Sequence, residues 1–354
     1  MFDHRKSVSD HLCLPVLGIV GKNTPQKQPI SAVSNGKTNH SNNNQTNNFM
    51  RKIFISAFLL CAGMFANAQL LKVSTVEKVA LPADAKVSSA TMSPDGNFVV
   101  LSYLNKAGLD KFDLNTKQSS QISASGSSYD LKISSDSRSV VFRESVVKPN
   151  RMRYTALKGV DLAQGKEIVL VDATRNLQGF NVVGANVSAV ENGRLKARNL
   201  MGTRGTSVPV ASIDKGQLCV TVNGKTTVIS PQGQDGQSYL WPSVSPDGTK
   251  VAYYLAAKGC YVCNIDGSNP VYLGILRAPK WYNEEIIVGM RDHDNGHFVT
   301  ESAIYASAID GSEEQVLTDR SVMAMYPSAN AEGSKVAFTT PNGDLYIIHV
   351  TTAK

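Results

Sequence analysis

The fold is decided by a stretch that the chain repeats, WPSVSPDGTKVAYY at residues 241–254. It aligns with YPSANAEGSKVAFT at residues 326–339, 85 positions later, and TMSPDGNFVV at residues 91–100 is a third copy. A second motif repeats between the first two copies, because NIDGS at residues 264–268 recurs as AIDGS at 308–312. Motifs that recur at a fixed period indicate a structure assembled from equivalent units.

Each motif contains residues that favour tight turns. In Ser-Pro-Asp-Gly the proline presets φ, the aspartate bonds to the backbone two residues on, and the glycine accepts a positive φ. Asn-Gly pairs at residues 192–193, 223–224 and 342–343 stand between apolar runs and are strong hairpin signals. The first kind of turn is expected to join the first strand of a unit to the second, and Asn-Gly to join the second to the third.

From residue 69 onward the chain has no helical period, and short runs of Val, Ile, Thr, Tyr and Phe alternate with polar turn residues. The third strand of each unit is expected to end at one of seven positions, which are Asp113, Asp161, Asn199, Ser230, Asp266, Asp310 and His349. Units of about 39 residues match four-stranded propeller blades. We therefore predict an all-β β-propeller of four-stranded antiparallel blades, seven in number. The alternative is six, if residues 175–204 and 205–236 form one distorted blade. A strand within Leu70 to Pro82 is expected to pair with the last blade and close the ring.

The residue pattern near the N-terminus predicts that the protein is exported. Met50, Arg51 and Lys52 precede a short apolar run, and Ala66-Asn-Ala68 resembles a signal peptidase site. We expect residues 50–68 to be a signal peptide cleaved after Ala68, because the run is too short for a membrane anchor. Residues 1–49 are expected to be disordered, or mis-assigned upstream of a start at Met50. A lipoprotein signal at Cys61 is disfavoured, because Leu60 precedes the cysteine where such signals have a small residue. The predicted product, residues 69–354, is a single periplasmic or secreted domain.

Removal of the predicted leader changes the charge. The full chain is formally +7, but residues 1–68 hold seven of its 36 basic and two of its 29 acidic residues. Residues 69–354 are therefore only +2, which argues against a nucleic-acid partner.

Three cysteines remain after residue 68, namely Cys219, Cys260 and Cys263. An odd count excludes a framework in which every cysteine is paired. Cys260 and Cys263 have the spacing of a redox pair, but residues three apart in a strand face opposite sides. We expect both to be small buried hydrophobes.

The turn motifs carry a family resemblance. Residues 93–96 and 245–248 are SPDG, while SSDS at 134–137 and NAEG at 330–333 are diminished forms. This pattern resembles the WD-like repeat of TolB-type propellers, which are periplasmic components of cell-envelope systems. The resemblance covers nearly all of residues 70–352 and implies the propeller fold more strongly than a function, because the residues are turn formers. TolB itself has six blades and a separate N-terminal domain, for which the expected mature chain leaves no room.

Recognised catalytic motifs are missing from the sequence. The chain contains no G-x-S-x-G, no H-E-x-x-H and no Gly-rich loop ending in Lys-Ser/Thr. We therefore predict no enzymatic activity, no catalytic residue, no cofactor and no metal.

Candidate binding residues fall in three groups. One expected long loop holds Arg291, Asp292, His293, Asp294 and His297, with Glu301 nearby, which could serve proton transfer or a metal, or simply form a solvated turn. A second, at about residues 144–154, holds Lys148, Arg151 and Arg153, and should lie on the same face of the ring. Trp241, Trp281 and Tyr326 take matching places near the entry to an inner strand, where they could form a shelf for a ligand or seal neighbouring blades.

These observations favour a non-catalytic, envelope-associated binding propeller that recognises a protein or an envelope polymer through loops at the channel mouth. The alternative is a propeller lyase or hydrolase acting on a glycan or lactone with the loop His/Asp cluster. An intracellular sensor would require the signal at Met50 to be spurious. No membrane span is expected in the mature chain.

Overall fold

The computed structural model describes residues 69–200, 203–330, 332 and 334–352. This part of the chain contains strands and turns without a helix, and so has no helix able to span a membrane. The predicted signal peptide, its cleavage site, Cys61 and the extension at residues 1–49 all lie outside the described residues.

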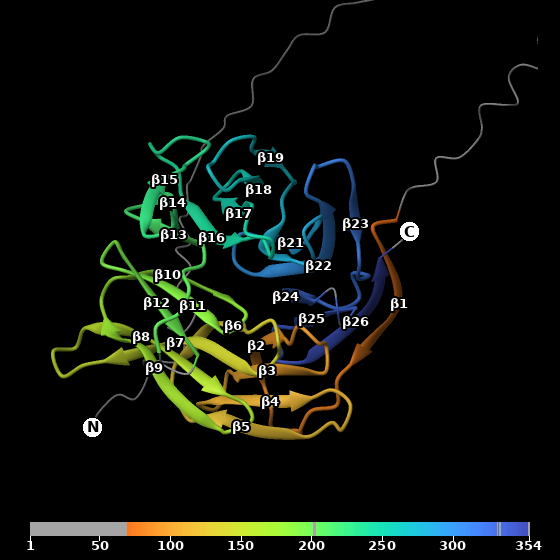
Figure 1. Cartoon of the computed structure of the whole chain (residues 1–354). Helices are drawn as coiled ribbons and strands as arrows, with labels where there is room; N and C mark the ends of the chain where they lie inside the picture. Colours follow the sequence, from red (N-terminus) through yellow and green to blue (C-terminus); the bar gives the residue numbers. More distant parts are fainter. Residues whose placement is uncertain (1–68, 201–202, 331, 333, 353–354) are drawn as a thin grey trace, which may run out of the picture. The chain divides into compact units, whose positions relative to one another are not determined.

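The strands form seven antiparallel sheets around a common centre (Figure 1). We number them as blades in chain order. Blade 1 holds β2 (Val87–Met92), β3 (Phe98–Tyr103), β4 (Leu109–Asp113) and β5 (Ser119–Ser123). Blade 2 holds β6 (Ser128–Ile133), β7 (Ser139–Val147), β8 (Arg153–Asp161) and β9 (Lys166–Thr174). Blade 3 holds β10 (Leu177–Val183), β11 (Asn186–Glu191) and β12 (Arg194–Asn199). Blade 4 holds β13 (Val210–Asp214), β14 (Gln217–Val222) and β15 (Lys225–Val228).

The remaining blades have four strands each. Blade 5 holds β16 (Tyr239–Val244), β17 (Lys250–Leu255), β18 (Gly259–Asn264) and β19 (Val271–Tyr272). Blade 6 holds β20 (Arg277–Trp281), β21 (Ile286–Asp294), β22 (Val299–Ala308) and β23 (Glu314–Val316). Blade 7 holds β24 (Met325–Asn330), β25 (Lys335–Thr339) and β26 (Leu345–Thr352), with β1 (Leu71–Lys78) as its outer strand. Because residues 175–204 and 205–236 give separate sheets, the count is seven and the six-blade alternative is excluded.

The first strand of every blade lies innermost, and these strands contact one another in sequence around the ring. The predicted four strands per blade are present in five blades, whereas blades 3 and 4 have three among the described residues. A single bridge between Arg198 and Arg204 stands in the outer position of blade 3. In blade 4 the corresponding segment, residues 229–238, is rich in glycine and includes Pro231, and such residues interrupt a ladder.

The repeated turns have the predicted geometry. In blade 1 the Ser93 hydroxyl donates to Asp95 Oδ1 at 2.6 Å and accepts from the Phe98 amide at 3.1 Å. Blades 2 and 5 repeat the arrangement at Ser134 and Ser245. Each turn joins the inner strand to the second strand, as expected from the sequence. The Asn-Gly pairs likewise join second to third strands in blades 3, 4 and 7.

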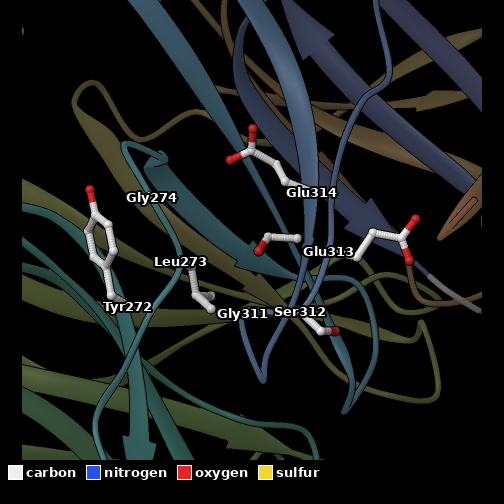
Figure 2. Close-up of a pocket in the computed structure, with 8 residues that line it drawn as sticks. Tyr272, Leu273, Gly274, Gly311, Ser312, Glu313 and Glu314 are labelled. Atoms are coloured by element: carbon white, nitrogen blue, oxygen red, sulfur yellow. The ribbon is translucent and has the colours of Figure 1, made fainter. Parts of the chain in front are cut away.

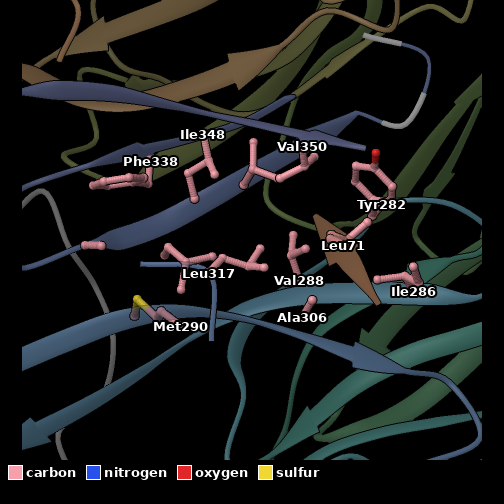
Figure 3. Packing of buried hydrophobic residues seen from close by; sticks show 13 residues of the cluster. Leu71, Tyr282, Ile286, Val288, Met290, Ala306, Leu317, Phe338, Ile348 and Val350 are labelled. Carbon is pink, nitrogen blue, oxygen red and sulfur yellow. The ribbon is translucent and has the colours of Figure 1, made fainter. Parts of the chain in front are cut away.

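The core consists of six apolar clusters, each placed between two adjacent blades. Figure 3 shows the cluster between blades 6 and 7, where Leu71 of β1 packs among residues such as Val288 and Ile348. Cys263 belongs to the cluster between blades 4 and 5, and Cys260 to the one between blades 5 and 6. The two thiols are thus free, buried and on opposite faces of one strand, as predicted.

Candidate functional site

Two long hairpins extend from the same face of the ring, because both connect the second strand of a blade to the third. One is β7–β8 of blade 2, paired from Ser139–Asp161 out to Val147–Arg153, and the other is β21–β22 of blade 6. The sequence had suggested long loops in both places. Most of those residues instead extend the ladders, leaving only residues 148–152 and 295–298 as turns.

The tips of these hairpins carry the most exposed large apolar side chains of the described chain. Phe298 is 76% exposed at the tip of β21–β22, and Val147 is 66% exposed at the tip of β7–β8. Met152, beside Val147 in the turn, is 45% exposed. We call Val147, Met152 and Phe298 the tip residues. Exposed apolar side chains gathered on one face of a protein are typical of interaction surfaces.

The β7–β8 tip is also basic. The Lys148 Nζ lies 4.2 Å from the centre of the Tyr154 ring, a cation–π arrangement that holds the ammonium beside the turn. Arg151 occupies the turn with a φ of 62°, and Arg153 is exposed at the start of β8. None of these three side chains forms an ion pair with a described residue. The predicted basic group is therefore brought together at one tip with its charge unpaired.

The second predicted group divides into two parts. Arg291 is committed to the scaffold, because it pairs with Glu314, donates to the Ile275 carbonyl at 3.2 Å and lies over the Tyr305 ring at 4.3 Å. Asp292 is buried, with a side chain only 3% exposed, and its Oδ2 accepts from Arg277 Nη1 at 2.6 Å. Its Oδ1 has no hydrogen-bond partner among the described residues. Arg291 and Asp292 thus connect β21 to its neighbouring strands. Of the predicted group, only His293, Asp294 and His297 face the solvent.

The histidines are exposed and are not gathered with carboxylates into a ligand set. His293 lies opposite Glu301 in the ladder, and Glu301 is paired with Arg320 Nε at 2.9 Å. His297 lies in the turn, where its amide donates to Asn295 Oδ1 at 3.0 Å. Within the described ranges, no three His, Cys, Asp or Glu side chains are close enough to share a metal ion.

The three aromatic residues do not occupy equivalent places. Trp241 in β16 and Tyr326 in β24 both lie at a β-bulge with a φ near 50°, and both are followed by proline. In β20 that position belongs to Ala278, and Trp281 lies three residues further along. The prediction that the three aromatic residues take matching places is thus wrong for Trp281. In β20 the residue equivalent to Trp241 and Tyr326 is Ala278, which, like them, is followed by a proline, Pro279.

The aromatic rings pack between blades. Trp241 makes an edge contact with Tyr254, with ring centres 5.5 Å apart. Trp281 Nε1 donates to the Ser243 carbonyl at 3.4 Å, and both tryptophans pack against the cluster between blades 5 and 6. Tyr326 packs against the cluster between blades 6 and 7. All three remain partly exposed, so each joins the apolar core to the inner edge of the ring.

A pocket of about 370 Å³ lies at the outer edge between blades 5 and 6 (Figure 2). Its walls come from residues 272–274 and 311–314, with Ser307. Glu314 lines it but is already paired with Arg291. The pocket is shallow and one of its two glutamates is paired within the scaffold, so it is a weaker candidate than the hairpin face.

Two lysines of the inner strands had no assigned role in the sequence. Lys132 of β6 donates to Asn181 Oδ1 of β10 at 3.1 Å, and Lys280 of β20 is exposed. The place of each lysine in its strand follows from the bulges at Asp130 and Ala278, which the sequence did not predict.

The comparisons with known proteins agree with the fold. No protein-family model matches the chain, and no curated protein sequence matches it. A putative TolB from Agrobacterium tumefaciens superimposes with a TM-score of 0.50 at 14% identity, covering 78% of this chain and 96% of that one. The fold is that of a TolB-like propeller.

Other solved structures match the chain as well. A chain from a mitotic checkpoint complex gives a TM-score of 0.53 at 10% identity, covering 81% of this chain and 96% of its own. An oligogalacturonate lyase from Vibrio parahaemolyticus gives 0.44 at 16% identity, over 75% of this chain and 78% of its own. Identities this low establish the fold alone, and the neighbours include both TolB proteins and lyases.

Proposed function

We propose that this propeller is an envelope-associated binding module whose two long hairpins hold a partner protein at the channel mouth. The observation that carries the proposal is the placement of the tip residues, because the two most exposed large apolar side chains of the described chain lie on separate hairpins of one face. A rigid ring keeps such projections at a fixed distance, so a partner that contacts both loses little extra entropy on binding.

The unpaired charges indicate the kind of partner. Lys148, Arg151 and Arg153 flank Val147 and Met152, so the complementary surface is apolar and bordered by carboxylates. An anionic envelope polymer would satisfy the cations but would leave Phe298 in water. A protein partner accounts for both features.

Site-specific photo-crosslinking in the native envelope tests this proposal. A crosslinker at position 298 and one at position 147 should capture the same protein. One at Val169 should not, since that side chain is 55% exposed on the outermost strand of blade 2. Phe298→Ser and Val147→Ser should each weaken binding of the captured protein at least tenfold, as is usual for central apolar contacts. Equal capture from position 169, or adducts with polymer alone, would count against the proposal.

The envelope location is a proposal that rests on residues 50–68. It is supported by the position of β1, which begins at Leu71, shortly after the expected cleavage at Ala68. N-terminal sequencing of the protein from its native source should find Gln69 as the first residue. A mature chain that retains residues before Met50 would contradict export through this signal.

A further inference from the structure

The tip of the β21–β22 hairpin contains a fourth Asn-Gly pair, Asn295-Gly296. Both residues are exposed, and the Asn295 amide donates to the Phe298 carbonyl at 3.1 Å, which closes the turn. Gly296 has a φ of 87° and no Cβ, so no side chain of its own hinders its amide nitrogen. An asparagine followed by glycine can react with its own backbone, because the amide nitrogen of the glycine can attack the side-chain carbonyl carbon.

The proton lost in such a reaction has an acceptor in this turn. The Gly296 amide donates to Asp294 Oδ1 at 2.9 Å. A carboxylate within hydrogen-bond distance of the proton to be removed is placed to act as a general base. Asp294 is exposed and forms no ion pair with a described residue, so no cation shares its charge.

The side-chain carbonyl of Asn295 is polarised by two donors. Its Oδ1 accepts from the His297 amide at 3.0 Å and from the Phe298 amide at 2.9 Å. Attack on Cγ moves negative charge onto this oxygen, and two backbone N–H groups at such distances stabilise that charge. The same turn therefore supplies a base for the nucleophile and two donors for the developing oxyanion.

The other three Asn-Gly pairs lack this combination among the described residues. The Gly193 amide donates to a neutral acceptor, Gln178 Oε1, at 2.7 Å, and the Gly343 amide donates to a backbone carbonyl at 2.9 Å. Asn223 is exposed, as Asn295 is, but its Oδ1 accepts from a serine hydroxyl at 3.2 Å and not from two backbone amides. Exposure is thus shared, whereas the placement of a carboxylate and two amides is particular to the hairpin tip.

We propose that Asn295 is a site of self-catalysed deamidation, with Asp294 as the base. The Gly296 nitrogen forms a bond to Asn295 Cγ while its proton passes to Asp294. The Cγ–Nδ2 bond then breaks, and the side-chain nitrogen leaves as ammonia with that proton. A water molecule opens the resulting succinimide at either carbonyl, which gives aspartate or isoaspartate at position 295.

Deamidation changes the tip that carries Phe298. Each product adds a carboxylate three residues before Phe298, and isoaspartate also inserts a side-chain carbon into the main chain. A new charge beside Phe298 opposes the burial of that side chain against an apolar surface. Deamidated protein should therefore bind its partner more weakly. This consequence rests on the proposed function, whereas the reaction itself does not.

Incubation of the purified protein at neutral pH, followed by peptide mass spectrometry, tests the proposal. In the folded protein, Asn295 should deamidate at least about tenfold faster than Asn192 and Asn223, because a positioned base typically contributes more than that. In the urea-unfolded chain the rates at the three sites should become similar, because the turn is lost. The unfolded chain is thus the control for the intrinsic reactivity of each Asn-Gly pair.

A variant of the base gives the second test. Asp294→Ala should slow deamidation of Asn295 about tenfold in the folded protein and leave the rate in the unfolded chain unchanged. Asp172→Ala is the matched control and should change neither rate, because it removes an exposed carboxylate that makes no hydrogen bond with the described residues.

Val147→Ser separates this reaction from the proposed function. It removes the partner contact of the other hairpin and should leave the deamidation rate unchanged, so the reaction persists even if no partner binds there. The proposal is overturned if Asn295 reacts no faster than Asn192 and Asn223 in the folded protein, or if Asp294→Ala reacts as the wild type does.

Discussion

Gly179 in β10 occupies a position where the neighbouring blade leaves no room for a side chain. A Cβ at this residue would meet the Ala211 carbonyl oxygen and the Ser212 Cβ at 2.8 Å. Gly179→Ala must therefore push blades 3 and 4 apart, and we expect it to lower the free energy of unfolding by about 1–3 kcal/mol, as overpacking does. Urea denaturation measures this. Gly126→Ala is the matched control, because nothing lies within 4 Å of its Cβ position.

The cysteines of β18 should behave as core residues. Burial raises the pKa of Cys260 and of Cys263 to about 12, so almost no thiolate exists at neutral pH. We expect neither thiol to react with a disulfide reagent at pH 8 within the time needed to label the urea-unfolded chain completely. Rapid labelling of both in the native state would show that the faces of blade 5 are less closely packed than described.

Residues whose partners are close in the sequence could be predicted, and residues whose partners are distant could not. The turn residues Ser93 and Asp95 could be assigned from local chemistry, because their bonding partners lie within five positions. The positions of Lys132 and Lys280 in their inner strands could not, because they depend on bulges that shift the register. Arg291 appeared to be a surface residue for the same reason, since its partner Glu314 belongs to a strand 23 positions away.

At the level of elements, the positions of hairpins were easier to predict than the number of strands in each blade. All three Asn-Gly pairs join a second strand to a third, with a two-residue connection in blades 3 and 4 and a five-residue connection, residues 340–344, in blade 7. The outer strands of blades 3 and 4 have no comparable local signal, because an outer strand is held on one edge only. Long ladders at residues 139–161 and 286–308 were mistaken for loops, since their polar outer ends resemble loop composition.

Strand β1, which closes the ring, is held by a side chain of blade 6 as well as by its ladder with β26. Gln315 of β23 accepts from the Leu71 amide at 2.9 Å and donates to the Leu71 carbonyl at 2.7 Å. Leu71 is fully buried, so Gln315→Ala leaves two backbone groups unsatisfied. We expect a loss of about 2–4 kcal/mol from the two missing bonds. Val316→Ala, at an exposed neighbouring position, should change the unfolding midpoint little. An unchanged midpoint in Gln315→Ala would mean that the ladder alone closes the ring.

At the scale of the whole molecule, the repeated turns make stability depend on pH in the same way in several blades. A hydrogen bond from Ser134 lowers the pKa of Asp136, and one from Ser245 lowers that of Asp247. Burial raises the pKa of Asp95, but its hydrogen bonds outweigh that effect and the net shift is again downward. A carboxyl whose folded pKa lies below its unfolded value, about 3.9, stabilises the fold above that value. The contribution is lost as the pH falls through the folded pKa.

The urea concentration at the unfolding midpoint should therefore decrease as the pH is lowered from 5 toward the acid limit of folding. The equivalent turns should contribute to this decrease together. Asp247→Asn should lower the midpoint at pH 7, because the amide lacks the charge that strengthens the bond from Ser245. The variant should also show a shallower fall toward low pH, since one titrating group has been removed. Asp172→Asn is the control, because that exposed carboxylate makes no hydrogen bond or ion pair with the described residues. If both variants follow the wild-type pH profile, the turn carboxylates do not link folding to protonation, and the repeats stabilise the ring through backbone geometry alone.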